Sequence, residues 1–276
     1  MGYAVHSLSQ RIGAEVLGVD LSRGMDCALA ERLNRALLEH IVLVIRDQHL
    51  DPERYVAAMR SLGVPARQNH AKQLMPGFPE IWVIDSRQAE VSATGERMLF
   101  GANSWHTDHT NLDRPPKVTA LLAVQLPPSG GDTSFVNAYA AYQRLSSATR
   151  RRIDSLRVIY GADRHLQQRE EDRDAFARAV AHPLVRTHPE TGRRALYCHP
   201  LKAQSIDGMA PERSFELIDR VLTEALAADI TYRHVWKHGD LVLIDNRACL
   251  HRAHKNYDPD SGRVMHRVIV EGDVPV

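Results

Sequence analysis

Three side chains able to bind a metal crowd into four positions of the segment 103–113, which reads NSWHTDHTNLD. They are His106, Asp108 and His109. In an extended segment residues i and i+2 point to the same side, so His106 and Asp108 can face one point while Thr107 faces away. A chain with 15 histidines produces such a pair by chance fairly often. A polar turn therefore remains the alternative until a third ligand is found.

A third candidate ligand is His251, which follows the strongly apolar run DLVLID in the segment 240–254. Two imidazoles and one carboxylate on one face of a metal suit Fe(II) and leave coordination positions open for other ligands. A zinc hydrolase could use the same three residues, but it would also need a well-placed general base. A non-catalytic jelly-roll binding protein would not need a complete triad. Both stay as alternatives to an iron enzyme.

Two arginines follow His251 at a spacing that places them on the same face of a strand. In the run GRVMHRVIV, Arg263, Met265 and Arg267 share one face of a predicted strand. Buried guanidiniums are costly unless they meet anions, and a guanidinium forks onto a carboxylate through two charge-assisted bonds. A solvated strand edge is the alternative. Beside a metal ligand, the pair instead indicates a dicarboxylate cofactor, to which Thr133 of GGDTSF could add a hydroxyl donor.

The elements that position these residues are mostly short strands separated by turns that contain proline or glycine. Apolar and β-branched runs predict strands at 41–48, 80–85, 117–126, 132–136, 182–188, 195–199, 232–237, 240–245 and 263–270. Helical spacing predicts helices at 28–40, 51–63, 138–156 and 211–228. Strands and helices do not alternate regularly, so we predict a mainly β core with helical decoration. A two-sheet jelly roll has an open mouth for a metal and a small ligand.

Composition limits the partners and the location that we expect. The 276 residues are 43% hydrophobic and 25% charged, without a repeat or linker, which predicts one domain over 1–276. A formal net charge of +1 gives no field that would favour nucleic acid or a membrane surface. No run approaches the roughly 20 apolar residues of a membrane helix, and the start lacks the pattern of a signal peptide. Three scattered cysteines indicate a reducing compartment, so we expect a cytoplasmic protein.

Five motifs in order along nearly the whole chain give the sequence a family resemblance. They are GAEVLGVDLS, SWHTDHT, LPPSGGDTSF, GDLVLIDNRACLHRA and RVMHRVIVEGD. Together they resemble the taurine dioxygenase-like (TauD/TfdA) group of Fe(II)- and 2-oxoglutarate-dependent oxygenases. The resemblance implies a double-stranded β-helix, that is, a jelly roll. It also implies hydroxylation coupled to the conversion of 2-oxoglutarate and O₂ into succinate and CO₂.

Carried over by position, the resemblance assigns a role to each matching residue. His106, Asp108 and His251 would bind Fe(II), while Thr133 and Arg263 would hold the distal carboxylate of 2-oxoglutarate. Arg267 corresponds to an arginine that faces an anionic substrate group in several members. The expected substrate is therefore a small sulfonate, sulfate ester, phosphonate or aryloxyalkanoate. We also expect a homo-oligomer, either a dimer or a tetramer.

Substrate contacts are the least specified part of the sequence. The candidates are Asn69, His70, Asn103, His109 and Asn111. Taurine dioxygenases have valine where this chain has His109, which favours a substrate other than taurine. The alternatives are a solvated loop histidine for His70 and a supporting hydrogen bond for His109. The charged stretch 163–179 could cover the active-site mouth or be a solvated segment, and Cys249 could point into the site or fill the core.

Overall fold

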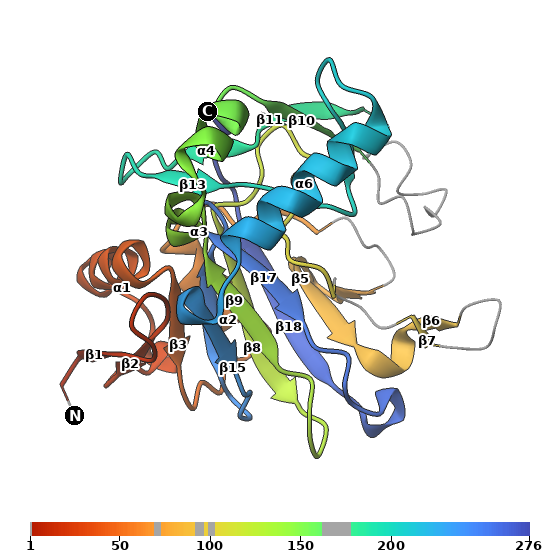
Figure 1. Cartoon of the computed structure of the whole chain (residues 1–276). Helices are drawn as coiled ribbons and strands as arrows, with labels where there is room; N and C mark the ends of the chain where they lie inside the picture. Colours follow the sequence, from red (N-terminus) through yellow and green to blue (C-terminus); the bar gives the residue numbers. More distant parts are fainter. Residues whose placement is uncertain (1, 69–72, 92–96, 99–102, 162–177) are drawn as a thin grey trace.

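The computed structural model of the chain describes residues 2–68, 73–91, 97–98, 103–161 and 178–276 (Figure 1). Its largest element is an eight-stranded sheet with the order β1-β2-β3-β16-β8-β18-β5-β4. All neighbours are antiparallel except β2 and β3. These strands span Ala4–Ser7 (β1), Ala14–Leu17 (β2), Val42–Ile45 (β3), Leu74–Met75 (β4), Phe78–Asp85 (β5), Val118–Gln125 (β8), Leu241–Asp245 (β16) and Val264–Val270 (β18).

A three-stranded sheet in the order β15-β9-β17 lies against one face of the large sheet. It consists of Thr133–Asn137 (β9), Thr231–His234 (β15) and Cys249–Ala253 (β17). Strand β16 shows how both faces of the large sheet are covered. Val242 and Ile244 pack with residues of β9 and β17, whereas Leu241 and Leu243 pack with residues of α1 and α2. The result is the mainly β jelly roll that the sequence predicts.

Short strands extend this core. One small sheet has the order β11-β10-β14, with Arg157–Tyr160 (β10), Val180–Pro183 (β11) and Ala203–Ile206 (β14). Two hairpins pair Val185–Thr187 (β12) with Arg194–Leu196 (β13), and Glu90–Val91 (β6) with Arg97–Met98 (β7). The strand expected over 182–188 is therefore split between β11 and β12. The split comes at Pro183 and Leu184, because proline has no backbone N–H for a strand interior.

The helices cover the outside of the sandwich, with α1 beside β3 and β16, α2 beside β5 and β18, and α6 beside β14 (Figure 1). Helix α1 spans Cys27–His40 and α2 spans Pro52–Arg60. Their N-caps are Asp26 and Asp51, whose carboxylates accept from the backbone N–H groups of Leu29 and Arg54. Helix α6 spans Pro211–Ala225 and begins at proline, as expected of a first helical position.

The single helix predicted over 138–156 is wrong. The chain instead forms α3 (Ala138–Arg144) and α4 (Ser147–Ile153). The break comes at Ser146, whose hydroxyl oxygen accepts from the Thr149 N–H at 3.1 Å and caps α4. A serine side chain competes in this way with the helical backbone bonds, so an amphipathic pattern that continues across it does not guarantee a continuous helix.

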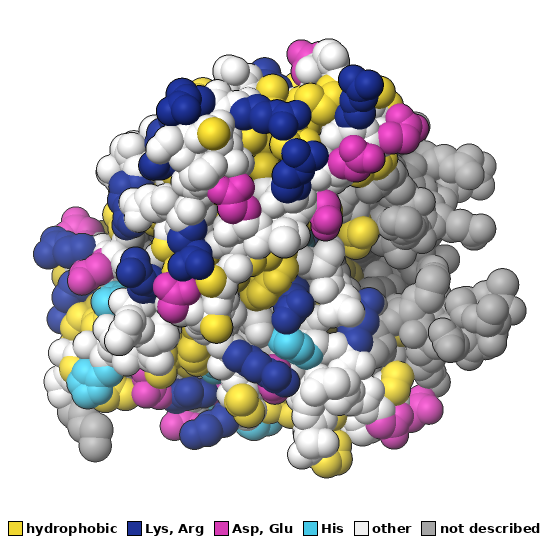
Figure 2. All heavy atoms as spheres, in the orientation of Figure 1, with side chains coloured by type: hydrophobic (Ala, Val, Ile, Leu, Met, Phe, Trp, Pro, Cys, Tyr) yellow, Lys and Arg dark blue, Asp and Glu magenta, His cyan; other side chains and the backbone are white. Residues whose placement is uncertain are grey.

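The charges on the surface agree with the formal net charge of +1. Figure 2 shows basic and acidic side chains interspersed over the visible face rather than one field of a single sign. Among the described residues, no helix combines the length and apolarity that crossing a membrane requires.

Candidate metal and cosubstrate site

Two segments far apart in the sequence bring the three predicted ligands together. His106 and His251 form an isolated β-bridge, with backbone N···O distances of 3.0 and 2.7 Å. Asp108 follows in a turn, and its Oδ1 lies 3.8 Å from Nε2 of each histidine. One ligand atom from each residue lies within 4.8 Å of the other two, and all three residues are buried. This arrangement fits a metal bound on one face.

The protonation states suit metal binding. Burial and the neighbouring His251 lower the pKa of His106 to about 3, and burial lowers the pKa of His251 as well. Both imidazoles are therefore neutral at pH 7, with lone pairs available. Burial alone would raise the pKa of the Asp108 carboxyl, but His251 and Arg267 outweigh it and hold that pKa well below its ordinary value. The site presents two neutral nitrogens and one carboxylate.

A buried chain of hydrogen bonds fixes the Asp108 carboxylate. The Thr119 hydroxyl on β8 donates to Asp108 Oδ2 at 2.6 Å, and the Asn246 amide donates to Thr119 Oγ1 at 2.8 Å. The backbone carbonyl of Asn246 accepts from the Thr107 hydroxyl at 2.7 Å, so Thr107 faces away from the ligands as the sequence predicts. Oδ2 is thus occupied, and Oδ1 faces the two imidazoles.

Thr119→Val should weaken metal binding while preserving the fold. Valine keeps the shape of threonine but leaves Asp108 Oδ2 without its donor. We expect Mn(II) affinity, measured as free Mn(II) by electron paramagnetic resonance, to fall roughly 10- to 100-fold. Thr231→Val is the matched control, because that hydroxyl bonds the Ala227 carbonyl outside the site. Equal Mn(II) affinities for Thr119→Val and the wild type would contradict a supporting role for Thr119.

A second buried cluster holds the turn that leads from β16 to His251. The Asp245 carboxylate accepts from Arg247 Nε at 2.9 Å, from Arg247 Nη2 at 2.9 Å and from His188 Nε2 at 3.1 Å. Burial would raise the pKa of Asp245, but these donors outweigh it and lower that pKa to about 2. Arg247 Nη1 also donates to Glu190 at 2.6 Å. The turn before β17 is therefore tied to the β12–β13 hairpin.

Asp245→Asn should destabilise the protein in a pH-dependent way. The pKa is lower in the folded chain, about 2, than the ordinary 3.8, so the ionised carboxylate stabilises the fold above pH 3.8. We expect the variant to lose roughly 2 kcal/mol in free energy of unfolding at pH 7. In urea titrations the difference from the wild type should shrink as the pH falls from 3.8 towards 2. Asp219→Asn on the exposed face of α6 is the control, and a pH-independent difference for Asp245→Asn would contradict the assignment.

Arg263 and Thr133 face the same pocket as the triad. The pocket is lined by His106, Asp108, His251, Thr133, Arg263, Arg267, Trp82, Ile84, Thr119, Leu121, Ala253 and Met265. Arg263 lies just before β18, where it shares a face with Met265 and Arg267 despite a register shift between Val264 and Met265. The predicted alternation of this segment is confirmed.

Arg263 forms no ion pair within the described part of the chain, although the Asp132 carboxylate acts on its charge from a greater distance. Its Nε donates to the Gly131 carbonyl at 3.2 Å, and no carboxylate in the described part of the chain pairs with it. Burial lowers the pKa of Arg263. Gly131 has a φ of +73°, and a Cβ there would lie 3.0 Å from Arg263 Cδ, so glycine is what permits this close approach. Thr133 Oγ1 accepts from Trp236 Nε1 at 3.1 Å, which leaves the threonine hydrogen free to donate.

Arg267 is buried and already has several neighbours. Its Cζ lies 4.3 Å from the centre of the Trp82 ring, and its Nη1 lies 3.9 Å from Asp108 Oδ1. Nη2 donates to Gln68 Oε1 at 2.9 Å and to His109 Nε2 at 3.0 Å. Nε is buried without a hydrogen-bond partner among the described residues. The side chain therefore depends less on an external anion than the sequence argument assumed.

The other predicted substrate contacts are not gathered in the pocket. Asn69, His70 and nearly all of the stretch 163–179 lie outside the described residues. Asn103 is exposed and does not line the pocket. His109 is buried beside Arg267 but also does not line it. Cys249 belongs to the apolar core, where its thiol contacts the Leu250 carbonyl.

Sequence reasoning did not find His199, Trp236, Gln68, Thr119 or Asn246. The ring of His199, just after β13, lies 4.8 Å from the ring of His106, and burial and His106 hold the pKa of His199 well below its ordinary value. Four of them reach the site from segments more than 60 positions away, whereas Thr119 lies only 11 positions from Asp108 but on the separate strand β8. Among the motifs near the site, only GGDT gave a local signal, because its two glycines predict that the backbone comes close to other groups near Thr133.

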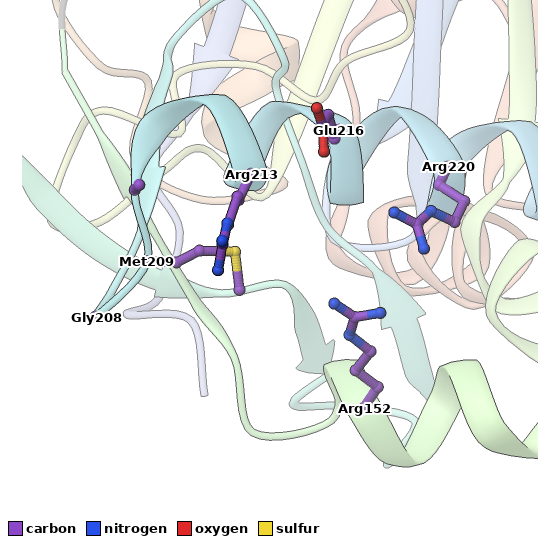
Figure 3. Close-up of a pocket in the computed structure, with 7 residues that line it drawn as sticks. Arg152, Gly208, Met209, Arg213, Glu216 and Arg220 are labelled. Atoms are coloured by element: carbon purple, nitrogen blue, oxygen red, sulfur yellow. The ribbon is translucent and has the colours of Figure 1, made fainter.

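A hollow larger than the triad pocket lies between α4 and α6 (Figure 3). It has a volume of about 520 Å³ and shares no lining residue with the triad pocket. Figure 3 shows Arg152 and Arg220 pointing towards each other across it, with Met209 and Arg213 at the other end. All three arginines are exposed. The hollow therefore offers no buried polar group directed at a ligand.

Comparison with known proteins decides the class of this site. The profile described as "Taurine catabolism dioxygenase TauD, TfdA family" matches residues 4–269. The chain belongs to this family. It is accordingly a 2-oxoglutarate-dependent dioxygenase, an oxidoreductase, and neither a zinc hydrolase nor a non-catalytic binding protein.

Several TauD/TfdA relatives resemble the chain over nearly its whole length. An alpha-ketoglutarate-dependent sulfate ester dioxygenase of Pseudomonas putida is 34% identical, covering 99% of this chain and 90% of that protein. An alpha-ketoglutarate-dependent 2,4-dichlorophenoxyacetate dioxygenase of Cupriavidus pinatubonensis is 29% identical, covering 100% of both. The crystal structure of AAD-2 in complex with Mn(II) and N-oxalylglycine matches with a TM-score of 0.83 at 27% identity, covering 100% of this chain and 99% of that one.

The residues present fit the metal and the cosubstrate that the family implies. Asp108 Oδ1 and the two imidazole nitrogens are too far apart to hydrogen-bond to one another, yet they face one point. They form the two-histidine, one-carboxylate donor set of non-haem iron enzymes. Across the pocket, Arg263 is a half-buried cation without an ion pair among the described residues, and Thr133 has a hydroxyl hydrogen to donate. A dicarboxylate would supply the missing charge.

Proposed function

We propose that this dioxygenase hydroxylates a small organic anion, with Fe(II) held by His106, Asp108 and His251 and with 2-oxoglutarate held by Thr133 and Arg263. When bound, the iron and the cosubstrate supply the oxidant that removes hydrogen from a C–H bond and returns hydroxyl. The observation that carries the proposal is the shared pocket, in which the three metal ligands and both cofactor-binding residues lie together.

The chain itself contributes binding, orientation and exclusion of water. Neutral imidazoles and an ionised carboxylate hold the metal without a competing proton, and the Thr119 hydrogen bond sets the direction of Asp108. Arg263 and Thr133 bind the far carboxylate of the cosubstrate through charge-assisted bonds. The apolar side chains Ile84, Leu121 and Met265 line the same pocket and limit the entry of water.

Arg267 is the residue that we assign to the anionic group of the substrate. It lines the same pocket beside Asp108, its Nε has no hydrogen-bond partner among the described residues, and its Nη1 lies 3.9 Å from Asp108 Oδ1. Arg267 lies four positions beyond Arg263 on the strand, about 13 Å along it, so the two cannot grip one carboxylate together. The names of the relatives support sulfate esters and aryloxyalkanoates as substrate classes.

A substrate screen tests this assignment with a matched set of hexyl compounds. We expect hexyl sulfate, hexane-1-sulfonate or hexylphosphonate to stimulate 2-oxoglutarate-dependent O₂ consumption and succinate formation in the Fe(II) enzyme. Phenoxyacetate covers the aryloxyalkanoate class. Hexan-1-ol is the uncharged control and should give only the background rate. Turnover of hexan-1-ol as fast as that of the anions would show that no anionic group is required.

Arg267→Gln should separate substrate binding from cosubstrate binding. We expect the KM of the anionic substrate to rise roughly 10- to 100-fold, because a charge-assisted hydrogen bond is lost. The metal-to-ligand absorption band of the anaerobic Fe(II)/2-oxoglutarate complex should persist. Arg186→Gln is the matched control, because Arg186 is a buried arginine that pairs with Asp273 outside the pocket. Loss of the band with an unchanged substrate KM would instead assign Arg267 to the cosubstrate.

A further inference from the structure

The hydrogen bonds of Arg267 are concentrated on a single nitrogen. Nη2 donates to Gln68 Oε1 at 2.9 Å and to His109 Nε2 at 3.0 Å. An Nη nitrogen carries two hydrogens, so these two acceptors use both of them. Every pair of neighbouring guanidinium donors that could fork onto one anion includes Nη2. With both acceptors in place, Arg267 has only Nη1 and Nε to offer.

The two acceptors are themselves held in place. Gln68 Nε2 donates to the Ala66 carbonyl at 3.3 Å, which turns Oε1 towards Arg267. His109 directly follows Asp108, and its backbone has a φ of +49°. Histidine is found in this left-handed region more often than β-branched residues such as valine. The turn that carries Asp108 therefore also directs the His109 ring onto Arg267.

The contact also fixes the tautomer of His109. Because the guanidinium can only donate, Nε2 of His109 is the acceptor, and the ring proton is on Nδ1. The imidazole faces Arg267 rather than the pocket lining. His109 thus acts on the pocket through Arg267.

We propose that His109 and Gln68 are positioning residues that fix the rotation of Arg267, so that it contacts the substrate anion through Nη1 or Nε and without a two-bond fork. The proposal rests on the assigned role of Arg267 in the proposed function. Because a planar carboxylate gains most from a complete fork, this arrangement favours a tetrahedral sulfate or sulfonate, whose three oxygens can take single bonds from several donors. Gln68 and His109 would then determine the class of anion that the enzyme accepts.

The first test observes directly whether His109 and Gln68 hold the Arg267 guanidinium in place, an arrangement that we call the clamp. In protein with ¹⁵N-labelled arginine, hindered rotation about the Cζ–Nη2 bond should give separate, slowly exchanging Nη2 proton signals, assigned by their loss in Arg267→Lys. We expect these signals in the wild type and in His109→Gln, whose amide oxygen can accept in place of Nε2. The separate signals should merge in His109→Asn, because asparagine tolerates the same backbone conformation but its side chain is too short to reach Arg267 Nη2. Their persistence in His109→Asn would overturn the proposal.

A second test measures what the clamp does for binding. We expect His109→Asn to weaken the binding of hexyl sulfate to the anaerobic Fe(II)/2-oxoglutarate enzyme roughly tenfold or more, with recovery in His109→Gln. Discrimination between hexyl sulfate and heptanoate should also fall in His109→Asn. His182→Asn, which removes a buried imidazole bonded to the Leu112 carbonyl, is the control for packing loss.

The outcomes separate this proposal from the proposed function. If the wild type binds neither hexyl sulfate nor heptanoate, the assigned substrate class fails, while the Nη2 signals still decide whether His109 holds Arg267. If the signals behave as expected but His109→Asn binds hexyl sulfate as tightly as the wild type, the clamp exists without a role in anion recognition, and the proposal is wrong.

Discussion

Alanine at His251 should reduce turnover roughly a thousandfold or more without unfolding the protein. The side chain supplies one of the three donor atoms that lie within 4.8 Å of one another, so its loss leaves an incomplete metal site. The fold does not need the imidazole, because the β-bridge between His106 and His251 is made by backbone atoms. Alanine at His106 or Asp108 should have the same effect. Succinate formation, bound iron and thermal unfolding are the measurements.

His254→Ala provides the matched control for His251→Ala. His254 lies three residues further along the chain, and its Nε2 contacts the Ser134 hydroxyl at 2.8 Å instead of the pocket. This variant should keep its iron and its activity. Near-normal iron content and succinate formation in His251→Ala would show that the three residues do not form the metal site.

The strands, the pair of arginines and the convergence of His106 with Asp108 could be predicted because their signals are local. The alternation over 263–267 put Arg263 and Arg267 on one face, and that face does line the pocket. His106 and Asp108 converge because only Thr107 separates them, although Asp108 lies in a turn and not in an extended strand. The i, i+2 spacing was sufficient information for these residues, whereas the approach of His251 depends on its β-bridge with the distant His106.

The supporting contacts could not be predicted because they join distant segments. Asp108 and Asn246 meet through the Thr119 hydroxyl, although Asn246 and Thr119 are 127 positions apart. Trp236 reaches Thr133 across 103 positions. Threonine, asparagine and tryptophan are common in cores and turns, so nothing local distinguishes the members of this network. Only the sheet register brings them together.

His109 shows how a correct local signal can lead to an incomplete interpretation. Its type and its position after Asp108 left open whether it contacts the substrate or makes a supporting hydrogen bond. The structure has the supporting hydrogen bond, and the ring faces Arg267 through a left-handed backbone conformation that the neighbouring sequence does not reveal. The single helix predicted over 138–156 was likewise an incomplete interpretation. The Ser146 hydroxyl caps α4 and separates it from α3, although the helical spacing of apolar residues continues past Ser146.

Arg263→Ala should weaken 2-oxoglutarate binding more than any other single change outside the metal ligands. Two charge-assisted hydrogen bonds to one carboxylate are lost, at a cost of roughly 3–5 kcal/mol, which corresponds to a few hundred- to several thousand-fold in affinity. The variant should fold, because Arg263 gives up its bond to the Gly131 carbonyl and its contacts with the Trp236 and Tyr257 rings, but no ion pair within the described part of the chain. Titration of the metal-to-ligand absorption band under anaerobic conditions measures the affinity.

Two further variants show whether the fork or the charge is responsible. Arg263→Lys keeps a positive charge but offers no planar pair of donors, so its affinity for 2-oxoglutarate should lie between those of the wild type and Arg263→Ala. Arg233→Ala removes an arginine that pairs with Asp132, next to Thr133 but outside the pocket lining, and should leave the affinity unchanged. An affinity in Arg263→Ala equal to that of the wild type would mean that another group binds the distal carboxylate. The charge of Arg263 would then need an anion of a different kind, because its described neighbours give it only the Gly131 backbone carbonyl, two aromatic rings and the more distant Asp132 carboxylate.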